Sequence, residues 1–203
     1  MSINISDRYK CIFIHVPRAA GTSIKEALEL SGRGHLPWQY YYLVYPEQWQ
    51  SYVKFSVVRN PWERALSTYC YAKMAKSYWS DNIKHINPHP DHELLRNKTF
   101  DECCEILLNN RNLLKHEAWH PQYVWIMKRE NDNYTLMVDY LLRFENLQHD
   151  AMQLFEILKI KNIKLPRVNP SDHKHYHQYY NQATKDIVDT IYIEDIRLFN
   201  YVF

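Results

Sequence analysis

The chain has 203 residues, which is enough for one compact domain over residues 1–203 and leaves little room for a second. It has only three glycines, where average proteins contain about 7% glycine, and 15% of its residues are aromatic; collagen-like, linker-rich and low-complexity architectures are therefore excluded. Because 25 basic residues nearly balance 23 acidic ones, we expect no nucleic-acid partner, and any anion must be bound locally.

The cysteines and the N-terminal residues indicate the compartment. Four cysteines, two of them adjacent at Cys103 and Cys104, are too few for a disulfide scaffold. Residues 1–10 lack the apolar stretch of a signal peptide, and no run of 18 apolar residues occurs. We therefore expect a cytoplasmic protein without a membrane span.

The first predicted elements form a strand, a loop and a helix. Residues 10–16 (KCIFIHV) are mostly apolar and β-branched and end at Pro17, which is typical of a buried parallel strand. Residues 22–30 have helical apolar spacing, and Ser23 with Glu26 suggests a capping box.

The second predicted strand, residues 53–58 (VKFSVV), leads directly into another helix. Asn60, Pro61 and Glu63 have the residue types favoured at the N-cap, first and third positions of a helix, so three independent signals agree.

The rest of the chain alternates helical and strand patterns. Polar residues 77–98 predict a long surface excursion, and further elements are expected as a helix over 99–109 with a Thr99–Glu102 capping box, strand material within 136–144, and helices over 146–158 and 184–198. Strands separated by helices predict an α/β fold, with a central, mainly parallel sheet flanked by helices.

The loop over residues 15–23 (HVPRAAGTS) is the first candidate site. A strand-to-helix junction offers backbone N–H groups to an anion, and Arg18 adds a charge. It is not a Walker A loop, because Val16 stands where the first glycine is required and Thr22 where the lysine is required. An ordinary helix start remains the alternative.

The second candidate site is residues 59–67 (RNPWERALS). Ser67 follows Asn60 by about two helical turns, so we expect it to share an anion with Arg59. Arginine suits phosphate because its planar guanidinium donates two parallel hydrogen bonds and keeps its charge. Alternatively, Arg59 is a surface ion-pair partner.

Together these motifs resemble those of sulfotransferases that use 3′-phosphoadenosine 5′-phosphosulfate (PAPS). PRAAGTS at 17–23 is similar to the family loop PKTAGTS, and VRNPWERALS at 58–67 to VRNPWxRxxS. Similarity continues through residues 98–103, 143–147 and 195–203 and so covers nearly the whole chain. The resemblance is nearest to the carbohydrate branch, sulfotransferase family 2, with heparan 2-O-sulfotransferase-like enzymes and small soluble bacterial relatives.

This resemblance implies a P-loop nucleotide-kinase-like sulfotransferase fold and transfer of a sulfuryl group from PAPS to a hydroxyl, most simply of a glycan, leaving adenosine 3′,5′-bisphosphate. It implies that Arg59 and Ser67 bind the 3′-phosphate. The residues implied to bind the rest of the donor are Pro17, Arg18, Ala19, Ala20, Gly21, Thr22 and Ser23, with His173, Lys174 and Tyr176 in a closing loop.

Two residues, Arg18 and His35, are the candidates for a catalytic role. Arg18 replaces the family lysine, and we expect it to stabilise the departing phosphate because this role needs a charge and no proton. His35 in Gly34-His35-Leu36 resembles the family's catalytic base. The alternatives are a P-loop-type phosphotransferase and an inactive nucleotide-binding module.

Several features are left open by the sequence. His15 is either a ligand contact or a buried structural histidine, and the aromatic residues of 38–45 suit either a sugar or the core. The alternating histidines at 173–177 suggest a metal, but no convincing ligand partner accompanies them, and none is expected. We expect the few glycines to mark close backbone approaches or positive φ. The acceptor identity and oligomeric state are not indicated.

Overall fold

The computed structural model describes residues 4–32, 34–74, 88–161, 165–166 and 174–203. Packing divides the chain into two compact units, each built from two separate stretches. Unit 1 is Met1–Arg59 with Gln122–Pro170, and unit 2 is Asn60–Pro121 with Ser171–Phe203. The single domain expected over residues 1–203 stays a prediction.

Unit 1 contains a four-stranded sheet in the order β1 (Ile5–Ser6), β2 (Cys11–Ile14), β3 (Val53–Val58) and β6 (Tyr140–Arg143). β2, β3 and β6 are parallel, and only β1 is antiparallel. All four residues of β2 are buried, as expected for a parallel strand covered on both faces. The predicted mixed α/β class with a mainly parallel sheet is confirmed.

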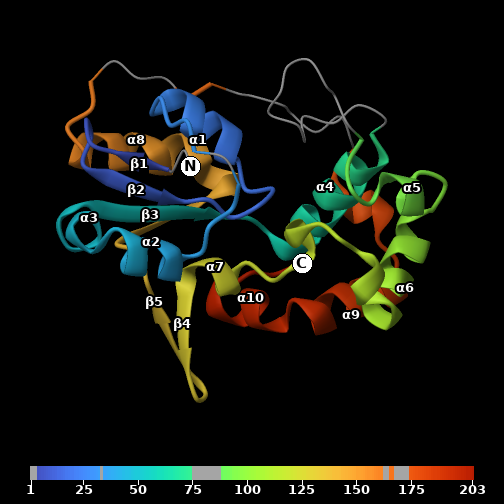
Figure 1. Ribbon diagram of the computed structural model, residues 1–203. Coiled ribbons are helices and arrows are strands. Elements are labelled where there is room, and N and C mark those ends of the chain that lie inside the picture. The colour runs from blue at the N-terminus through green and yellow to red at the C-terminus, as the bar shows by residue number, and fades with distance from the viewer. Residues whose placement is uncertain (1–3, 33, 75–87, 162–164, 167–173) are drawn as a thin grey trace. The chain divides into compact units, whose positions relative to one another are not determined.

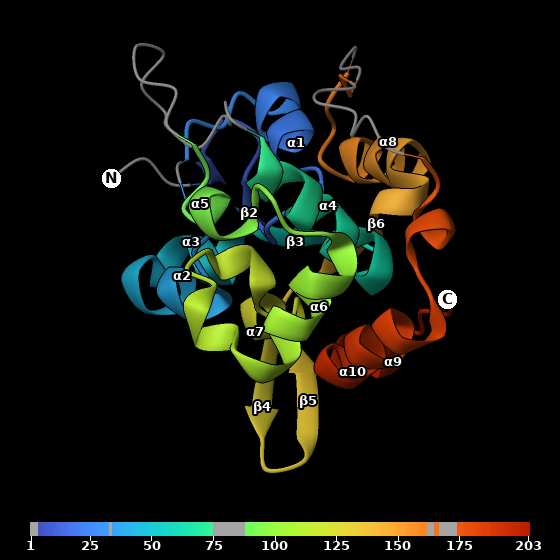
Figure 2. The ribbon, with the colours of Figure 1, turned by 90° about the vertical axis from the view of Figure 1, so that its right-hand side faces the viewer.

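The helices of unit 1 cover this sheet (Figures 1 and 2). They are α1 (Gly21–Ala27), α2 (Trp38–Val44), α3 (Pro46–Ser51), α7 (Tyr123–Ile126) and α8 (Leu147–Ile157), with the 3-10 turn η3 (Phe144–Asn146). In both views α1 and α8 lie on one side of the sheet, and α2 and α3 lie on the other. A separate hairpin joins β4 (Met127–Glu130) to β5 (Asn133–Leu136).

Unit 2 is helical in the part of the chain that the structure describes. Its helices are α4 (Pro61–Lys73), α5 (His92–Leu95), α6 (Phe100–Asn109), α9 (Gln182–Ile191) and α10 (Ile193–Leu198), with the 3-10 turns η1 (Arg111–Leu113), η2 (Glu117–Trp119) and η4 (Tyr176–Tyr179). Among the described helices, none combines the length and the apolar composition needed to cross a membrane.

The predicted start of α4 is confirmed. The side-chain oxygen of Asn60 accepts hydrogen bonds from the backbone N–H groups of Trp62 and Glu63 at 3.0 and 3.1 Å, with Pro61 in the first turn. The predicted capping box of Thr99 and Glu102 at the start of α6 is also present. Both starts depend on neighbouring residues only.

Three predictions of local structure were wrong. The N-cap of α1 is Ala20, which makes no side-chain capping bond, so the Ser23–Glu26 capping box is absent. The last predicted helix is two helices, α9 and α10, separated at Tyr192. The predicted surface excursion contains α5 and the buried Asp91, whereas residues 77–87 of that stretch lie outside the described residues.

Asp91 is buried because it organises the loop that follows α6. Its carboxylate accepts hydrogen bonds from the backbone N–H of Lys115 at 2.6 Å, from that of His116 at 3.2 Å and from Trp119 Nε1 at 2.8 Å. A buried carboxylate is tolerated when several donors surround it. This pairing is long-range and has no local sequence signal.

Candidate functional site

The loop between β2 and α1 holds two residues in the left-handed backbone region. Arg18 has φ 64° and Ala20 has φ 58°, although neither is glycine. Such conformations cost of order 1–3 kcal/mol each and persist where surrounding structure enforces them, often at ligand-binding sites. Two strained residues therefore lie in the predicted donor loop.

Gly21 is required because a side chain already fills its space. A Cβ atom added there would lie 1.7 Å from Nε2 of His15. At Gly34, φ is +81°, and at Gly32 an added Cβ would lie 1.9 Å from Oδ1 of Asn4. The expectation of a close approach or a positive φ is confirmed, and at Gly21 and Gly32 the close neighbour is the chain's own side chain.

His15 also contacts the predicted base. The rings of His15 and His35 are tilted, with centroids 4.3 Å apart, and the Trp125 ring lies 6.2 Å from His35 on edge. His15 is 8% exposed, and burial, with the nearby His35, Lys25 and Arg18, lowers its pKa well below the ordinary 6.5. His15 is therefore neutral at physiological pH, and it brings His35 next to the loop.

Arg59 from the second motif points toward the same loop. Its Nη1 donates to the backbone oxygen of Arg18 at 3.2 Å, and its guanidinium lies 3.9 Å from the ring centroid of Phe144. Gln122 holds the Arg59 backbone with two hydrogen bonds, accepting from its N–H and donating to its oxygen, both at 2.8 Å. The structure thus joins Arg18 and Arg59, which are far apart in the sequence.

Sequence reasoning missed Gln122 and had no signal for it. Phe144 was within a stretch matched to the family, residues 143–147, but no role followed from that match. Both residues act on Arg59 across long sequence separations, one on its backbone and one on its guanidinium. Contacts of this kind depend on the completed fold of unit 1.

The other predicted donor residues differ in accessibility. Pro17, Ala19 and Ser23 are buried, Ala20 is half-buried like Arg18, and Thr22 is exposed. Ser67 is fully buried in α4 and belongs to unit 2, whereas Arg59 belongs to unit 1. Joint binding of one phosphate by Arg59 and Ser67 therefore stays a prediction.

Within unit 2, Tyr176 lies beside the start of α4. Its hydroxyl accepts a hydrogen bond of 3.4 Å from Nδ2 of Asn60, and its ring lies 5.5 Å from that of Phe203. Lys174 is exposed, and His173 lies outside the described residues. In the stretches that the structure describes, no three His, Cys, Asp or Glu side chains group as a metal site.

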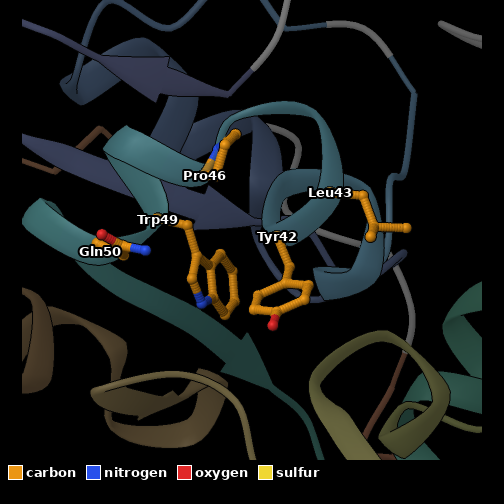
Figure 3. A pocket seen from close by; sticks show the side chains of 5 residues that line it. All are labelled: Tyr42, Leu43, Pro46, Trp49 and Gln50. Atoms are coloured by element: carbon orange, nitrogen blue, oxygen red, sulfur yellow. The ribbon is translucent and has the colours of Figure 1, made fainter.

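A pocket of about 250 Å³ opens between α2 and α3 in unit 1 (Figure 3). It is lined by Tyr42, Leu43, Pro46, Trp49 and Gln50. The rings of Tyr42 and Trp49 meet edge to face, with centroids 6.1 Å apart, and Tyr42 is half exposed. Aromatic walls with a nearby amide and hydroxyl suit a ligand that has both apolar faces and hydroxyl groups.

Comparison with known families decides the membership of the chain. The model of the sulfotransferase family matches residues 1–202. The chain belongs to the sulfotransferase family. Members of this family transfer a sulfuryl group, generally from PAPS. Membership therefore indicates that the protein is a transferase. A comparison with curated proteins found no match.

The loop of this sulfotransferase fits an anionic donor. Arg18 and Arg59 bring two permanent charges to one loop, and Arg59 as a whole residue is only 3% exposed, so it is largely shielded from water. The His15 ring fills the space beside Gly21, so only glycine fits at the start of α1. Arg18 in place of the family lysine is compatible with this chemistry.

Proposed function

We propose that this sulfotransferase moves a sulfuryl group from PAPS to a hydroxyl group of a carbohydrate. The observation that supports this most is the hydrogen bond of Arg59 to the carbonyl of Arg18, which joins the two motifs of the donor site. For unit 1, with its loop between a parallel strand and a helix, we propose the P-loop nucleotide-kinase-like form of the sulfotransferase fold.

The donor is held by charges and by the loop backbone. Arg18 and the backbone of Gly21-Thr22-Ser23 bind the phosphosulfate, and Arg59 with Ser67 binds the 3′-phosphate. For the rest of the nucleotide we propose Lys174, Tyr176 and His173, as the resemblance to the family implies. As the bond between sulfur and the bridging phosphate oxygen breaks, Arg18 stabilises the negative charge that develops on that oxygen.

The transfer needs one proton acceptor. The oxygen of the acceptor hydroxyl attacks sulfur in line with the leaving phosphate, and His35 takes the hydroxyl proton. The products are the sulfate ester, adenosine 3′,5′-bisphosphate and one proton, which His35 releases to water.

The pocket between α2 and α3 supports a carbohydrate acceptor. Tyr42 and Trp49 present aromatic surface, and Gln50 presents an amide that can bind sugar hydroxyls. α2 begins at Trp38, three residues after His35, so the pocket and the proposed base come from one continuous segment. We propose that part of the acceptor binds in this pocket.

Sulfation of a panel of unsulfated oligosaccharides, followed by mass spectrometry, tests the function. With PAPS and no metal we expect a product heavier by one sulfuryl group, and with His35→Ala less than about a hundredth of the wild-type rate, since a general base contributes roughly 10²- to 10⁴-fold. Phosphoryl transfer from ATP with Mg²⁺ instead would support a phosphotransferase. Donor-product binding without sulfation of any acceptor would support an inactive module.

A further inference from the structure

His15 occupies a position between the two parts of the proposed active site. Its ring stacks on Phe13 of β2, with centroids 5.4 Å apart, and the Phe13 ring stacks in turn on Phe55 of β3 at 5.1 Å. The ring of His15 is therefore anchored on the core of the sheet. β2 and β3 are hydrogen-bonded neighbours, so this support is rigid.

From that position, His15 contacts both the loop and the predicted base. Nε2 points at the Cα of Gly21, where a Cβ would come within 1.7 Å of it. The ring also lies 4.3 Å from the ring of His35, which is only half-buried and follows Gly34 with its positive φ.

A polar atom of His15 shows that this ring is more than core filling. Nδ1 is buried and has no hydrogen-bond partner among the described residues. A purely apolar side chain in this place would avoid the cost of burying such an atom without a hydrogen bond. An imidazole that costs stability in a strained loop region is typical of a residue kept for function.

We propose that His15 is a positioning residue, which fixes the distance between the donor loop at Gly21 and the base His35. This inference rests on the proposed function, because it assigns His35 as the base. The Nε2 edge of the ring supports the loop, and the ring face orients His35. A displacement of about 1 Å between reacting groups costs about 10²-fold in rate, so this spacing matters for turnover.

A double-mutant cycle tests the link to the base. The His15→Gln variant places an amide near the former Nε2 and removes the ring face. We expect it to retain the affinity for adenosine 3′,5′-bisphosphate within about threefold but to lower kcat at least about tenfold on the best oligosaccharide of the panel. In the His35→Ala background the same change should lower kcat less than about twofold, because there is no base left to orient. Equal effects in both backgrounds would overturn the proposal.

Enlarging the residue at position 21 and then shortening the side chain at position 15 tests the contact between His15 and the loop without any assay of activity. Gly21→Ala should lower the melting temperature and weaken binding of adenosine 3′,5′-bisphosphate in calorimetry, because its Cβ collides with His15. The double variant Gly21→Ala/His15→Ala should regain part of both, because the ring is gone. No recovery in either measurement would show that His15 does not set the position of the loop.

The Phe155→Leu variant is the matched control for core damage. Phe155 is a buried residue of α8 in the same unit and lies outside the stack of rings on which His15 packs. We expect a lower melting temperature with kcat within about twofold of the wild type. If Phe155→Leu lowered kcat as much as His15→Gln, the effect would be general destabilisation and the proposal would fail. If the wild type sulfated no acceptor, the proposed function would fail, and the variants at positions 21 and 15 would still decide the role of His15.

Discussion

At the scale of single residues, the protonation of His15 links the site to stability. Its pKa is lowered by burial and by the nearby His35, Lys25 and Arg18, so in the unfolded chain His15 binds a proton at a higher pH than in the folded protein. Above pH 6.5 both states are neutral at this residue. As the pH falls below 6.5, only the unfolded state gains the proton, and the free energy of unfolding decreases.

We therefore predict that His15→Gln flattens the pH dependence of stability. Denaturant unfolding at pH 7.5 and pH 5.5 measures the free energy of unfolding of both proteins. Between these pH values the wild type should lose more of this free energy than the variant, by up to about 1.4 kcal/mol per pH unit below 6.5. Other titrating groups contribute equally to both proteins. Parallel losses in the two proteins would mean that His15 is not held neutral in the fold.

A second prediction at this scale concerns the shape of the Arg59 guanidinium. Arg59→Lys keeps the charge but loses the planar group that donates to the Arg18 oxygen and packs on Phe144. We predict at least about tenfold weaker calorimetric binding of adenosine 3′,5′-bisphosphate, since a charge-assisted hydrogen bond contributes roughly 1.5–3 kcal/mol. The control is Arg8→Lys, at an exposed arginine paired with Glu29, which should bind normally. Unchanged binding in Arg59→Lys would remove Arg59 from the donor site.

At the scale of elements, the aromatic pocket on α2 and α3 makes a prediction about the acceptor. Tyr42→Ala removes an exposed pocket ring, whereas Val44→Ala changes an equally exposed residue of α2 that does not line the pocket. We predict a KM for the oligosaccharide about three- to tenfold higher with Tyr42→Ala and little change in kcat, from a stacking energy of about 0.5–1.5 kcal/mol. Similar KM values for the two variants would place the acceptor elsewhere.

The helices of unit 2 depend on a buried ion pair. Arg64 is fully buried, donates to the backbone oxygens of Ala118 and His120 at 2.8 and 2.9 Å, and lies 3.8 Å from the carboxylate of Asp195 in α10. Its guanidinium also lies 5.1 Å from the ring of Tyr192, whose pKa burial raises to about 12. The side chain of Arg64 in α4 therefore contacts both α10 and the backbone of residues 118–120.

We predict that Arg64→Met lowers the free energy of unfolding by about 3–5 kcal/mol, because the charge of Asp195 stays buried without Arg64 beside it. Arg64→Met/Asp195→Leu should recover most of this loss, since two apolar side chains replace the pair. The control Arg197→Met, at an exposed pair with Glu194 in α10, should cost less than about 1 kcal/mol. A double variant as unstable as Arg64→Met would contradict this account of α4 and α10.

Elements with local signals could be predicted from the sequence. The strand over residues 53–58 and the start of α4 after Asn60 were found because β-branched residues and capping chemistry act over a few neighbours. α2 and α3 were missed because their Tyr and Trp residues favour strands as much as helices. The break at Tyr192 was missed because its neighbours carry no glycine or proline to mark it; the Tyr192 hydroxyl donates to the distant Trp119 oxygen at 3.1 Å.

At the scale of the whole molecule, the sequence motifs located the candidate site but not the contacts that build it. PRAAGTS and VRNPWERALS were recognised by type and spacing, and the family match covers residues 1–202. Gln122 and the contact of Phe144 with Arg59 gave no comparable signal, and the sequence left the role of His15 open, because each acts through packing that only the folded unit 1 creates. The three glycines were a compositional oddity, and the structure explains Gly21 by the imidazole that fills its space.

The donor site that we propose is made for a 3′-phosphorylated adenine nucleotide and should discriminate against ATP. Calorimetric titration of the full chain with adenosine 3′,5′-bisphosphate and with ATP, each without and with Mg²⁺, measures this preference. We expect binding of adenosine 3′,5′-bisphosphate that is independent of Mg²⁺ and at least about 100-fold tighter than that of ATP, a difference of about 2.7 kcal/mol. Tighter binding of ATP, or no binding of either nucleotide, would rule out this donor site.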